Sequence, residues 1–277
     1  MPAWNSLILL YDGTFDGFLS AVLEAYRRKP RADKIEETDC QQEFGARYEE
    51  IESNFEDAQR VAAGIEKTMG TVAYEKVWTA FLSDDPKKSQ KLYQYICFGM
   101  KVGRLVNDDL TSDCVQAVEK MTALVRREAH KWIEFVRFGK LEGGIWYAKI
   151  APQNFVLPML MPHFSARFND MPFLLHDETH QQVAVYDLHG WQIISDKTMQ
   201  LPPYSAEEAE FRRLWRCFYD TVAIRERVNP ALRRQLMPKK YWKNIIEMQP
   251  DLSSYSKEEN PAALKNLIES KVNAKAP

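Results

Sequence analysis

The hydrophobic period of the chain changes at Phe135, and this change constrains the fold more than any single motif. Before it, apolar residues recur with helical spacing from Phe55 to Trp132. Gly70 interrupts that pattern, so about four helices are predicted over residues 54–134. After Phe135, β-branched and aromatic residues flank a Gly143-Gly144 pair, which is typical of a hairpin turn. The sequence therefore predicts a helical block followed by a sheet.

The flanking segments complete an α+β fold. Residues 7–10 (LILL) predict a short buried strand, residues 18–29 a helix, and the acid-rich stretch 33–57 a loop with a short helix or strand. Pro158 and Pro162 are interpreted as the ends of a short loop. We expect one compact domain over 1–250 and a loosely ordered tail over 251–277. The predicted sub-regions are an N-terminal strand–helix unit (1–53), a helical block (54–134), a small antiparallel sheet with a helix on one face (135–197), and basic C-terminal helices broken at Pro230 and Pro238 (204–250).

Composition excludes several classes of protein. The 277 residues carry a net charge of -2, so the whole chain has no nucleic-acid signature. No apolar run approaches the ~20 residues of a membrane helix, and no signal peptide is recognised, so a cytoplasmic protein is expected. The four cysteines are dispersed, which is typical of reduced thiols and not of disulfides or an iron–sulfur cluster. The nucleotide-binding loops GxxxxGK[ST] and GxGxxG do not occur, and no cofactor is predicted.

The stretch HDETH, residues 176–180, places two histidines at the spacing of zinc peptidases. Such a site needs both imidazoles on one helix face and a glutamate after the first. Here Asp177 follows His176, and the apolar flanks on both sides are typical of strands. We interpret the motif as a hairpin tip, either as ordinary polar residues or as a site for a phosphate or a base. His163 and His189 are further candidate ligands, but no metal site is predicted.

Positive charge is concentrated near the carboxyl end. Residues 211–243 hold ten Lys and Arg against two acidic residues, a net charge of +8, with aromatic residues between them. Cations neutralise phosphates and rings stack on unpaired bases, so the segment is typical of a nucleic-acid contact. The alternative is that the arginines solvate a helix face or pair with the acidic stretch 33–57. In that case one apolar helix face is expected to be core: Leu214, Trp215, Phe218, Val222 and Ile224.

Two further pairs of arginines are candidate anion contacts. Arg225 and Arg227 precede Asn229-Pro230, a pair expected to end a helix. They would form either a phosphate clamp or a cationic helix C-terminus favoured by the macrodipole. Arg137 in FVRF and Arg167 in SARF each lie among aromatic residues. A single such arginine usually packs with its tip in solvent, but two brought together beside the sheet would form a better anion site.

Seven short stretches, in four groups along the chain, together resemble a bacterial family described as "probable DNA metabolism protein". They are LYDGTFDGF (10–18), FVRF (135–138), PHFSARF (162–168) with PFLLHD (172–177), WRCFY (215–219), IRERVNP (224–230) and MPKKYW (237–242). The resemblance covers residues 5–247. It implies a gene neighbour that is a radical-SAM protein of DNA modification or repair, and in some members a fused iron–sulfur uracil-DNA glycosylase. This chain ends at Pro277 and lacks CxxxCxxC, so neither activity is expected of it.

We therefore expect an accessory protein that binds DNA and acts with a radical-SAM partner, and whether it is an enzyme stays open. His176 and Asp177 are the best candidates for a functional pair, and Tyr241 or Trp242 for stacking on a base. The alternatives are a non-enzymatic adaptor for that partner, or a metal-dependent enzyme centred on His163, His176, Asp177 and His180. The expected nucleic-acid contacts are Arg137, Arg167, Arg225, Arg227, Arg233, Arg234, Lys239, Lys240 and Trp242.

Overall fold

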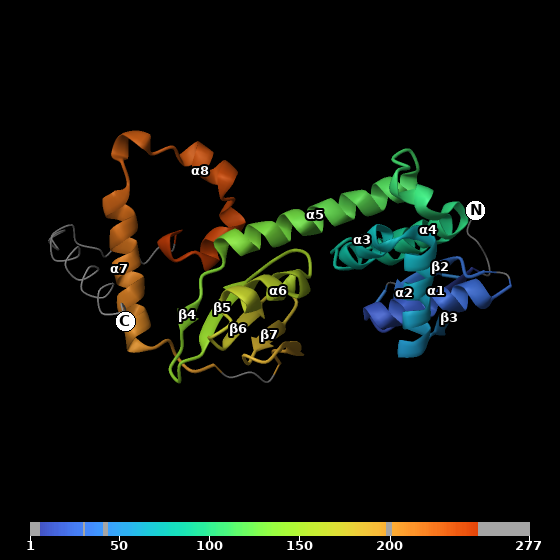
Figure 1. Ribbon diagram of the computed structural model, residues 1–277, viewed down its shortest axis with the longest axis horizontal. Coiled ribbons are helices and arrows are strands. Elements are labelled where there is room, and N and C mark those ends of the chain that lie inside the picture. Colours follow the sequence, from blue (N-terminus) through green and yellow to red (C-terminus); the bar gives the residue numbers. More distant parts are fainter. Residues whose placement is uncertain (1–5, 30, 41–43, 198–200, 249–277) are drawn as a thin grey trace. The chain divides into compact units, whose positions relative to one another are not determined.

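The computed structural model describes residues 6–29, 31–40, 44–197 and 201–248 (Figure 1). The chain clusters into two compact units. Unit 1 is Met1–Ala129 with Gln153–Val156, and unit 2 is His130–Pro152 with Leu157–Pro277. The mixture of helices and small sheets confirms the predicted α+β class. The single domain predicted over 1–250 stays a prediction, and the predicted tail lies outside the described residues.

Unit 1 contains a three-stranded parallel sheet in the order β2-β1-β3. Its strands are β1 (Leu7–Tyr11), β2 (Lys34–Glu37) and β3 (Arg47–Glu50). β1 is the predicted LILL strand: strands pair with both of its edges, and its side chains are buried because helices of unit 1 pack against the sheet. The acid-rich stretch supplies the two outer strands. The following helix, α1 (Phe15–Arg27), begins earlier than predicted because Thr14 Oγ1 accepts a hydrogen bond from Gly17 N at 3.0 Å and caps it.

The predicted helical block is confirmed; it lies in unit 1 except for the last turns of its fourth helix, which belong to unit 2. Residues 55–135, all of them described, form four helices: α2 (Phe55–Met69), α3 (Thr71–Phe81), α4 (Lys88–Val102) and α5 (Asp113–Phe135), with the 3-10 turn η1 (Gly103–Asn107) between the last two. Gly70 separates α2 from α3 with φ at +92°, a conformation that glycine adopts without strain. The apolar faces of α1 to α5 form the core of this unit together with the sheet.

Unit 2 is built on a five-stranded sheet in the order β4-β5-β6-β7-β8. The strands are β4 (Gly139–Lys140), β5 (Trp146–Ile150), β6 (Phe173–Asp177), β7 (Gln182–Tyr186) and β8 (Trp191–Ser195). The predicted hairpin at Gly143-Gly144 joins β4 to β5, and antiparallel pairs join β6 to β7 and β7 to β8. The prediction of a wholly antiparallel sheet is wrong, because β5 and β6 run parallel.

The parallel pair follows from a helix that is longer than the sequence predicts. α6 (Leu157–Arg167) connects β5 to β6, and parallel neighbours need such a crossover. Pro158 and Pro162, interpreted as the ends of a loop, both lie inside it. Pro158 is in the first turn of α6. The backbone N–H groups of a first turn have no acceptor within the helix, so a proline, which lacks that N–H, loses no hydrogen bond there. Burial of Leu160, Met161 and Phe164 offsets the hydrogen bond that Pro162 removes.

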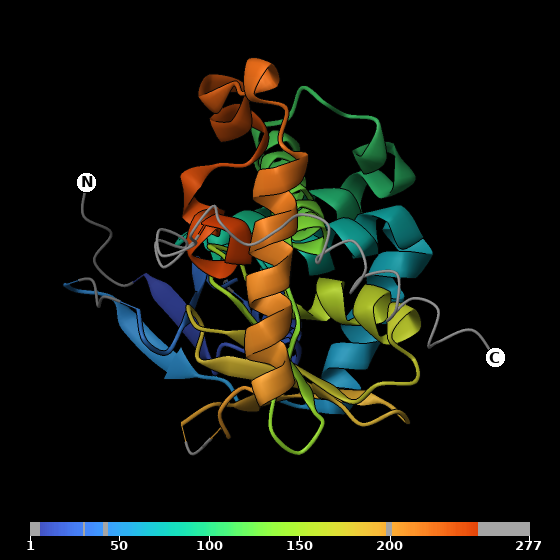
Figure 2. The ribbon, with the colours of Figure 1, turned by 90° about the vertical axis from the view of Figure 1, so that its left-hand side faces the viewer.

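The described C-terminal part is helical, as predicted. It comprises α7 (Ala206–Val222), η2 (Arg225–Arg227), α8 (Pro230–Leu236), η3 (Lys239–Asn244) and η4 (Ile246–Met248). α7 lies on the outside of unit 2 and stands in front of it in Figure 2, with contacts to β4 and η4. Within the described ranges, no helix combines the length and the apolar character that crossing a bilayer requires.

Candidate functional site

Cations gather on an exposed part of unit 2, residues 224–240, which we call the cationic segment. It holds six Lys and Arg against one acidic residue, Glu226, a net charge of +5. No residue of η2 or α8 is buried. Five of its exposed cations have no acidic partner among the residues that the structure describes: Arg225, Arg227, Arg233, Arg234 and Lys239.

The local sequence explains how this segment departs from a continuous helix. Asn229 Oδ1 accepts a hydrogen bond from Leu232 N at 3.0 Å, and Pro230 is the first helical residue of α8. The expectation that Asn-Pro ends a helix is therefore wrong: the pair begins α8, and α7 ends at Val222. Arg225 and Arg227 lie in the isolated turn η2 and not at a helix C-terminus, so the macrodipole does not explain their position.

Other cations of the basic region are neutralised within unit 2. Arg212 Nε lies 2.8 Å from Glu208 Oε1, and Arg213 Nη2 lies 2.9 Å from Glu210 Oε1. Lys243 Nζ lies 3.3 Å from Glu178 Oε2. These three residues are therefore neutralised, but by acids of unit 2 and not by the stretch 33–57 that the alternative named. The five cations of the cationic segment have no such acidic partner among the described residues.

The two candidate stacking residues differ in accessibility. Tyr241 is only 2% exposed, and its ring packs 4.9 Å from that of Trp132 and 5.0 Å from that of Phe135. It anchors η3 in the core of unit 2, so the expectation that Tyr241 stacks on a base is wrong. Trp242 is half-buried, with Arg233 5.3 Å and Lys239 6.0 Å from its ring centre. These cations surround the ring that was expected to receive a base.

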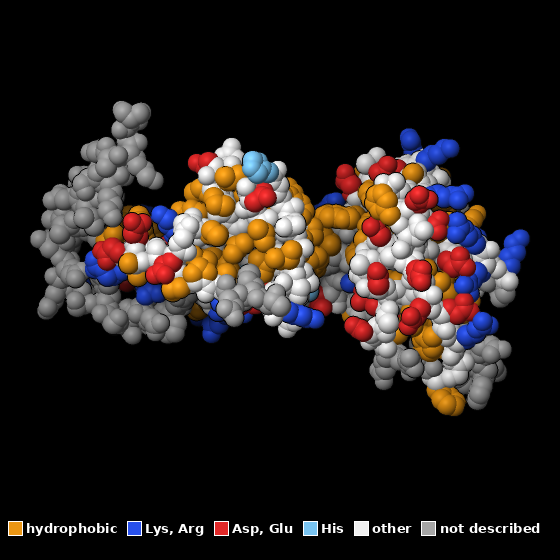
Figure 3. Space-filling view, turned by 90° about the horizontal axis from the view of Figure 1, so that it is seen from below, with side chains coloured by type: hydrophobic (Ala, Val, Ile, Leu, Met, Phe, Trp, Pro, Cys, Tyr) orange, Lys and Arg blue, Asp and Glu red, His pale blue; other side chains and the backbone are white. Residues whose placement is uncertain are grey.

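Apolar side chains are exposed at two places in unit 2. Trp215, Phe218 and Val222 on α7 were expected to be core, but they are 42%, 41% and 58% exposed. On the edge strand β8, Trp191 is 40% and Ile194 is 42% exposed. Figure 3 shows apolar side chains gathered over one face of unit 2, whereas charges of both signs are interspersed over unit 1. Unit 2 thus presents apolar surface of the kind that marks interaction sites.

Arg137 and Arg167 line the same pocket of unit 2, which has a volume of about 670 Å³. Arg137 follows α5 and Arg167 ends α6, so the packing of these helices beside the sheet brings the two residues together. The other lining residues are Ile133, Glu134, Val136, Phe138, Trp146, His163, Phe164, Phe168, Met171 and Phe173. We call this the arginine–aromatic pocket.

The guanidinium of Arg137 is held in place by several acceptors. Nη1 donates to the carbonyl oxygens of Glu134 and Val136 at 3.1 and 3.2 Å. Nη2 lies 3.2 Å from Glu247 Oε1, and Glu247 Oε2 also accepts from Trp215 Nε1 at 3.1 Å. Arg167, in contrast, is exposed, rests 5.8 Å from the ring of Phe168, and has no acidic partner in the described part of the chain.

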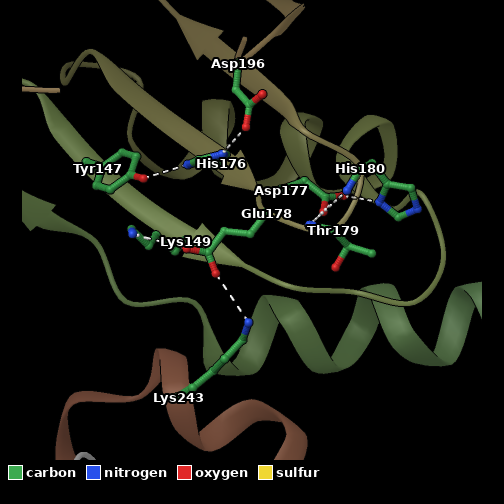
Figure 4. Close-up of polar contacts among 9 residues, drawn as sticks. All are labelled: Tyr147, Lys149, His176, Asp177, Glu178, Thr179, His180, Asp196 and Lys243. Atoms are coloured by element: carbon green, nitrogen blue, oxygen red, sulfur yellow. Dashed lines mark hydrogen bonds and ion pairs between the residues drawn. The ribbon is translucent and has the colours of Figure 1, made fainter. Parts of the chain in front are cut away.

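The HDETH motif spans the end of β6 and the hairpin tip that leads to β7: His176 and Asp177 are the last residues of the strand, and Glu178 to His180 lie in the tip (Figure 4). Asp177 is fully buried and closes the turn: Oδ1 accepts from the backbone N–H groups of Thr179 and His180 at 3.0 and 3.2 Å, and Oδ2 lies 2.6 Å from His180 Nδ1. Beside it, Glu178 pairs with Lys149 at 3.1 Å. Burial alone would raise the pKa of Glu178, but hydrogen bonds from Lys149 and Lys243 lower it below its usual range. These contacts stabilise the hairpin.

His176 and Asp177 do not form a pair. Neighbouring residues of a strand point to opposite faces, and His176 instead lies between Tyr147 and Asp196 (Figure 4). Its Nδ1 is 2.7 Å from Tyr147 Oη, and its Nε2 is 2.9 Å from Asp196 Oδ2. Burial raises the pKa of Tyr147, so this phenol stays protonated and can donate to the imidazole.

The residues proposed for a metal-dependent enzyme are not brought together. His163 lines the arginine–aromatic pocket, His176 faces Tyr147, and His180 faces Asp177. Within the described ranges, no three His, Cys, Asp or Glu side chains are grouped as metal ligands would be. Nothing in this geometry therefore favours the metal-dependent alternative.

Sequence reasoning missed four residues of these sites: Tyr147, Asp196, Trp146 and Glu247. Tyr147 and Trp146 stand in the predicted strand IWYAKI, where alternation places them on opposite faces. That alternation was a usable signal for both. Asp196 and Glu247 reach their partners only through the tertiary fold, and no local pattern indicates them.

Comparison with known proteins gives one family. No curated protein matches this chain at a meaningful level. The model of a family described as a domain of unknown function, DUF4130, matches residues 86–247. That range covers the last two helices of the helical block, the whole sheet of unit 2, the arginine–aromatic pocket and the cationic segment. Because the match spans more than half of the chain, the protein belongs to the DUF4130 family.

Proposed function

We propose that this protein binds DNA through its cationic segment and acts as an accessory in DNA metabolism or repair. The observation that carries the proposal is the group of five exposed cations without acidic partners between Arg225 and Lys239, within the described residues. Cations that are not neutralised internally displace counterions from phosphates, and the released ions drive association. Arg137, Arg167 and Lys240 are proposed as additional contacts. The radical-SAM partner is proposed from the motif resemblance alone.

The test is a salt titration of binding to labelled single-stranded DNA, with the double variant Arg233→Gln/Arg234→Gln. For single strands the slope of log K against log salt is about -0.7 per phosphate contact, so losing two contacts should flatten it by about 1.4. Affinity near 0.1 M salt should fall about tenfold or more. Fluorescence anisotropy measures both quantities.

A matched control is available in unit 1. Arg126 and Arg127 are adjacent, exposed arginines of α5, so Arg126→Gln/Arg127→Gln removes the same charge elsewhere. This control should keep the wild-type slope and affinity. An affinity that does not depend on salt concentration, or that falls equally in both double variants, would contradict the proposed role of the cationic segment.

A second candidate function is a non-enzymatic adaptor, favoured by the exposed apolar stripe of α7. Phe218 and Val222 are one helical turn apart and 41% and 58% exposed. We expect Phe218→Ala/Val222→Ala to reduce co-purification with the radical-SAM partner at least tenfold after nuclease treatment, because buried apolar anchors dominate interfaces. DNA affinity and far-UV circular dichroism should stay unchanged. If the double variant co-purifies with the partner as well as the wild type does, α7 is not the docking surface.

A further inference from the structure

The arginine–aromatic pocket has the size and lining of a small-molecule site. Its volume of about 670 Å³ falls within the ~300–1,000 Å³ of typical ligand pockets. Phe164 and Phe173, 3% and 0% exposed, form an apolar base. The half-buried rings of Phe138 and Phe168 lie 5.2 Å apart in an edge-to-face arrangement above them. The walls are therefore aromatic, and polar groups are few.

Trp146 offers a ring that is free to stack. It is half-buried on the first residue of β5, directly beside Phe173 in the register of the sheet. Among the described residues, no aromatic ring or cation stacks on its ring and no acceptor receives its indole N–H, and Trp146 lines the pocket. An unpartnered indole lining an aromatic pocket indicates a planar ligand.

The charges at the pocket indicate an anionic group on that ligand. Arg167 is exposed and lacks an acidic partner within the described ranges, whereas Arg137 is fixed by two carbonyl oxygens and Glu247. The one acidic lining residue, Glu134, is itself paired with Lys131 at 2.8 Å. Arg167 is thus the cation that remains for a phosphate, with Arg137 as a preorganised neighbour.

We infer that the arginine–aromatic pocket holds one nucleotide, with its unpaired base stacked on Trp146 and its 5′-phosphate on Arg167. Inorganic phosphate alone would leave the aromatic walls unused, and a purely apolar ligand would leave Arg167 without a partner. The base belongs to a bound strand if the proposed DNA binding is right, and in that respect the inference rests on the proposed function. A free nucleoside monophosphate carries the same chemistry.

The experiment follows quenching of tryptophan fluorescence on addition of thymidine 5′-monophosphate, thymidine, inorganic phosphate, and a short oligothymidylate. The last is compared with the same strand carrying one abasic site. We expect saturable quenching by the monophosphate, which is lost in Trp146→Phe, and saturable quenching by the intact strand, which is reduced in Trp146→Phe because Trp242 beside the cationic segment can still respond to the strand. Arg167→Gln should weaken monophosphate binding about tenfold, as expected for loss of one charge-assisted contact. The exposed Arg126→Gln should bind as the wild type does.

The outcomes separate this inference from the proposed function. If the strand binds with a normal salt slope but no quenching depends on Trp146, the inference about the pocket is wrong and the proposed DNA binding by the cationic segment still holds. Monophosphate binding that depends on Arg167, without any strand binding, supports the pocket as a free-nucleotide site and overturns DNA binding. Quenching by thymidine or by inorganic phosphate alone, equal in wild type and Arg167→Gln, overturns the inference. Weaker binding of the abasic strand supports a base held from a strand.

Discussion

Phe173→Ala is expected to lower the free energy of unfolding of unit 2 by about 3–5 kcal/mol, the usual cost of removing a buried phenylalanine ring. Phe173 is fully buried at the start of β6. Its ring lies 5.2 Å from that of Phe138, 6.2 Å from Phe168 and 5.1 Å from Tyr186. Truncation would leave a cavity under both the sheet and the arginine–aromatic pocket.

Urea denaturation followed by tryptophan fluorescence measures this loss, because five of the seven tryptophans lie in unit 2: Trp132, Trp146, Trp191, Trp215 and Trp242. Phe218→Ala is the matched control in the same unit, since that ring is 41% exposed; its cost should stay below about 1 kcal/mol. Equal losses in the two variants would mean that the aromatic cluster is not the core of unit 2.

Asp177→Ala is expected to destabilise the same unit by about 2 kcal/mol, because it removes the buried acceptor of three part-buried hydrogen bonds. The carboxylate is fully buried and accepts from two backbone N–H groups and from the imidazole of His180. The turn it closes also includes Gln181, whose φ of +54° is uncommon for a residue other than glycine. Losing the acceptor therefore removes what holds a strained turn in place.

Asp177→Asn separates the role of the oxygen from that of the charge. The amide oxygen still accepts from Thr179 N and His180 N, so the asparagine variant should lose about half as much stability as the alanine variant. Thermal unfolding measured by circular dichroism, together with the urea midpoint, provides the comparison. If Asp177→Ala unfolds like the wild type, the hairpin contacts contribute little, and Asp177 would regain interest as a functional residue.

Much of the fold was predictable because its signals are local. The helices α2 to α5 follow from apolar residues at helical period, and Gly70 separates two of them because of its own backbone conformation. The hairpins at Gly143-Gly144 and at HDETH follow from turn residues between β-type flanks. The direction of β6 against β5 was not predictable, because it depends on α6 and on burial that outweighs two prolines.

The candidate site also has some features that the sequence predicts and others that it does not. Sequence reasoning proposed Arg137, Arg167 and the cations from Arg225 onward as anion contacts, because residue type and charge density can be counted directly in the sequence. Their role as contacts stays a prediction. The same reasoning proposed His176 and Asp177 as a functional pair, and the structure gives the two side chains separate partners, as the alternation of a strand predicts. Sequence reasoning also took the apolar face of α7 as core. A periodic face shows that a helix has two sides, but not whether another element covers one of them.

By itself, the sequence determined the class of the fold, the positions of most helices and hairpins, and the excess of cations near the carboxyl end. Only the tertiary structure decided which cations are neutralised, which aromatic residues are buried, and that Arg137 and Arg167 share a pocket with Trp146. The reason is physical. Local conformation depends on neighbours within one or two turns, whereas burial, ion pairing and pocket formation depend on residues that are distant along the chain.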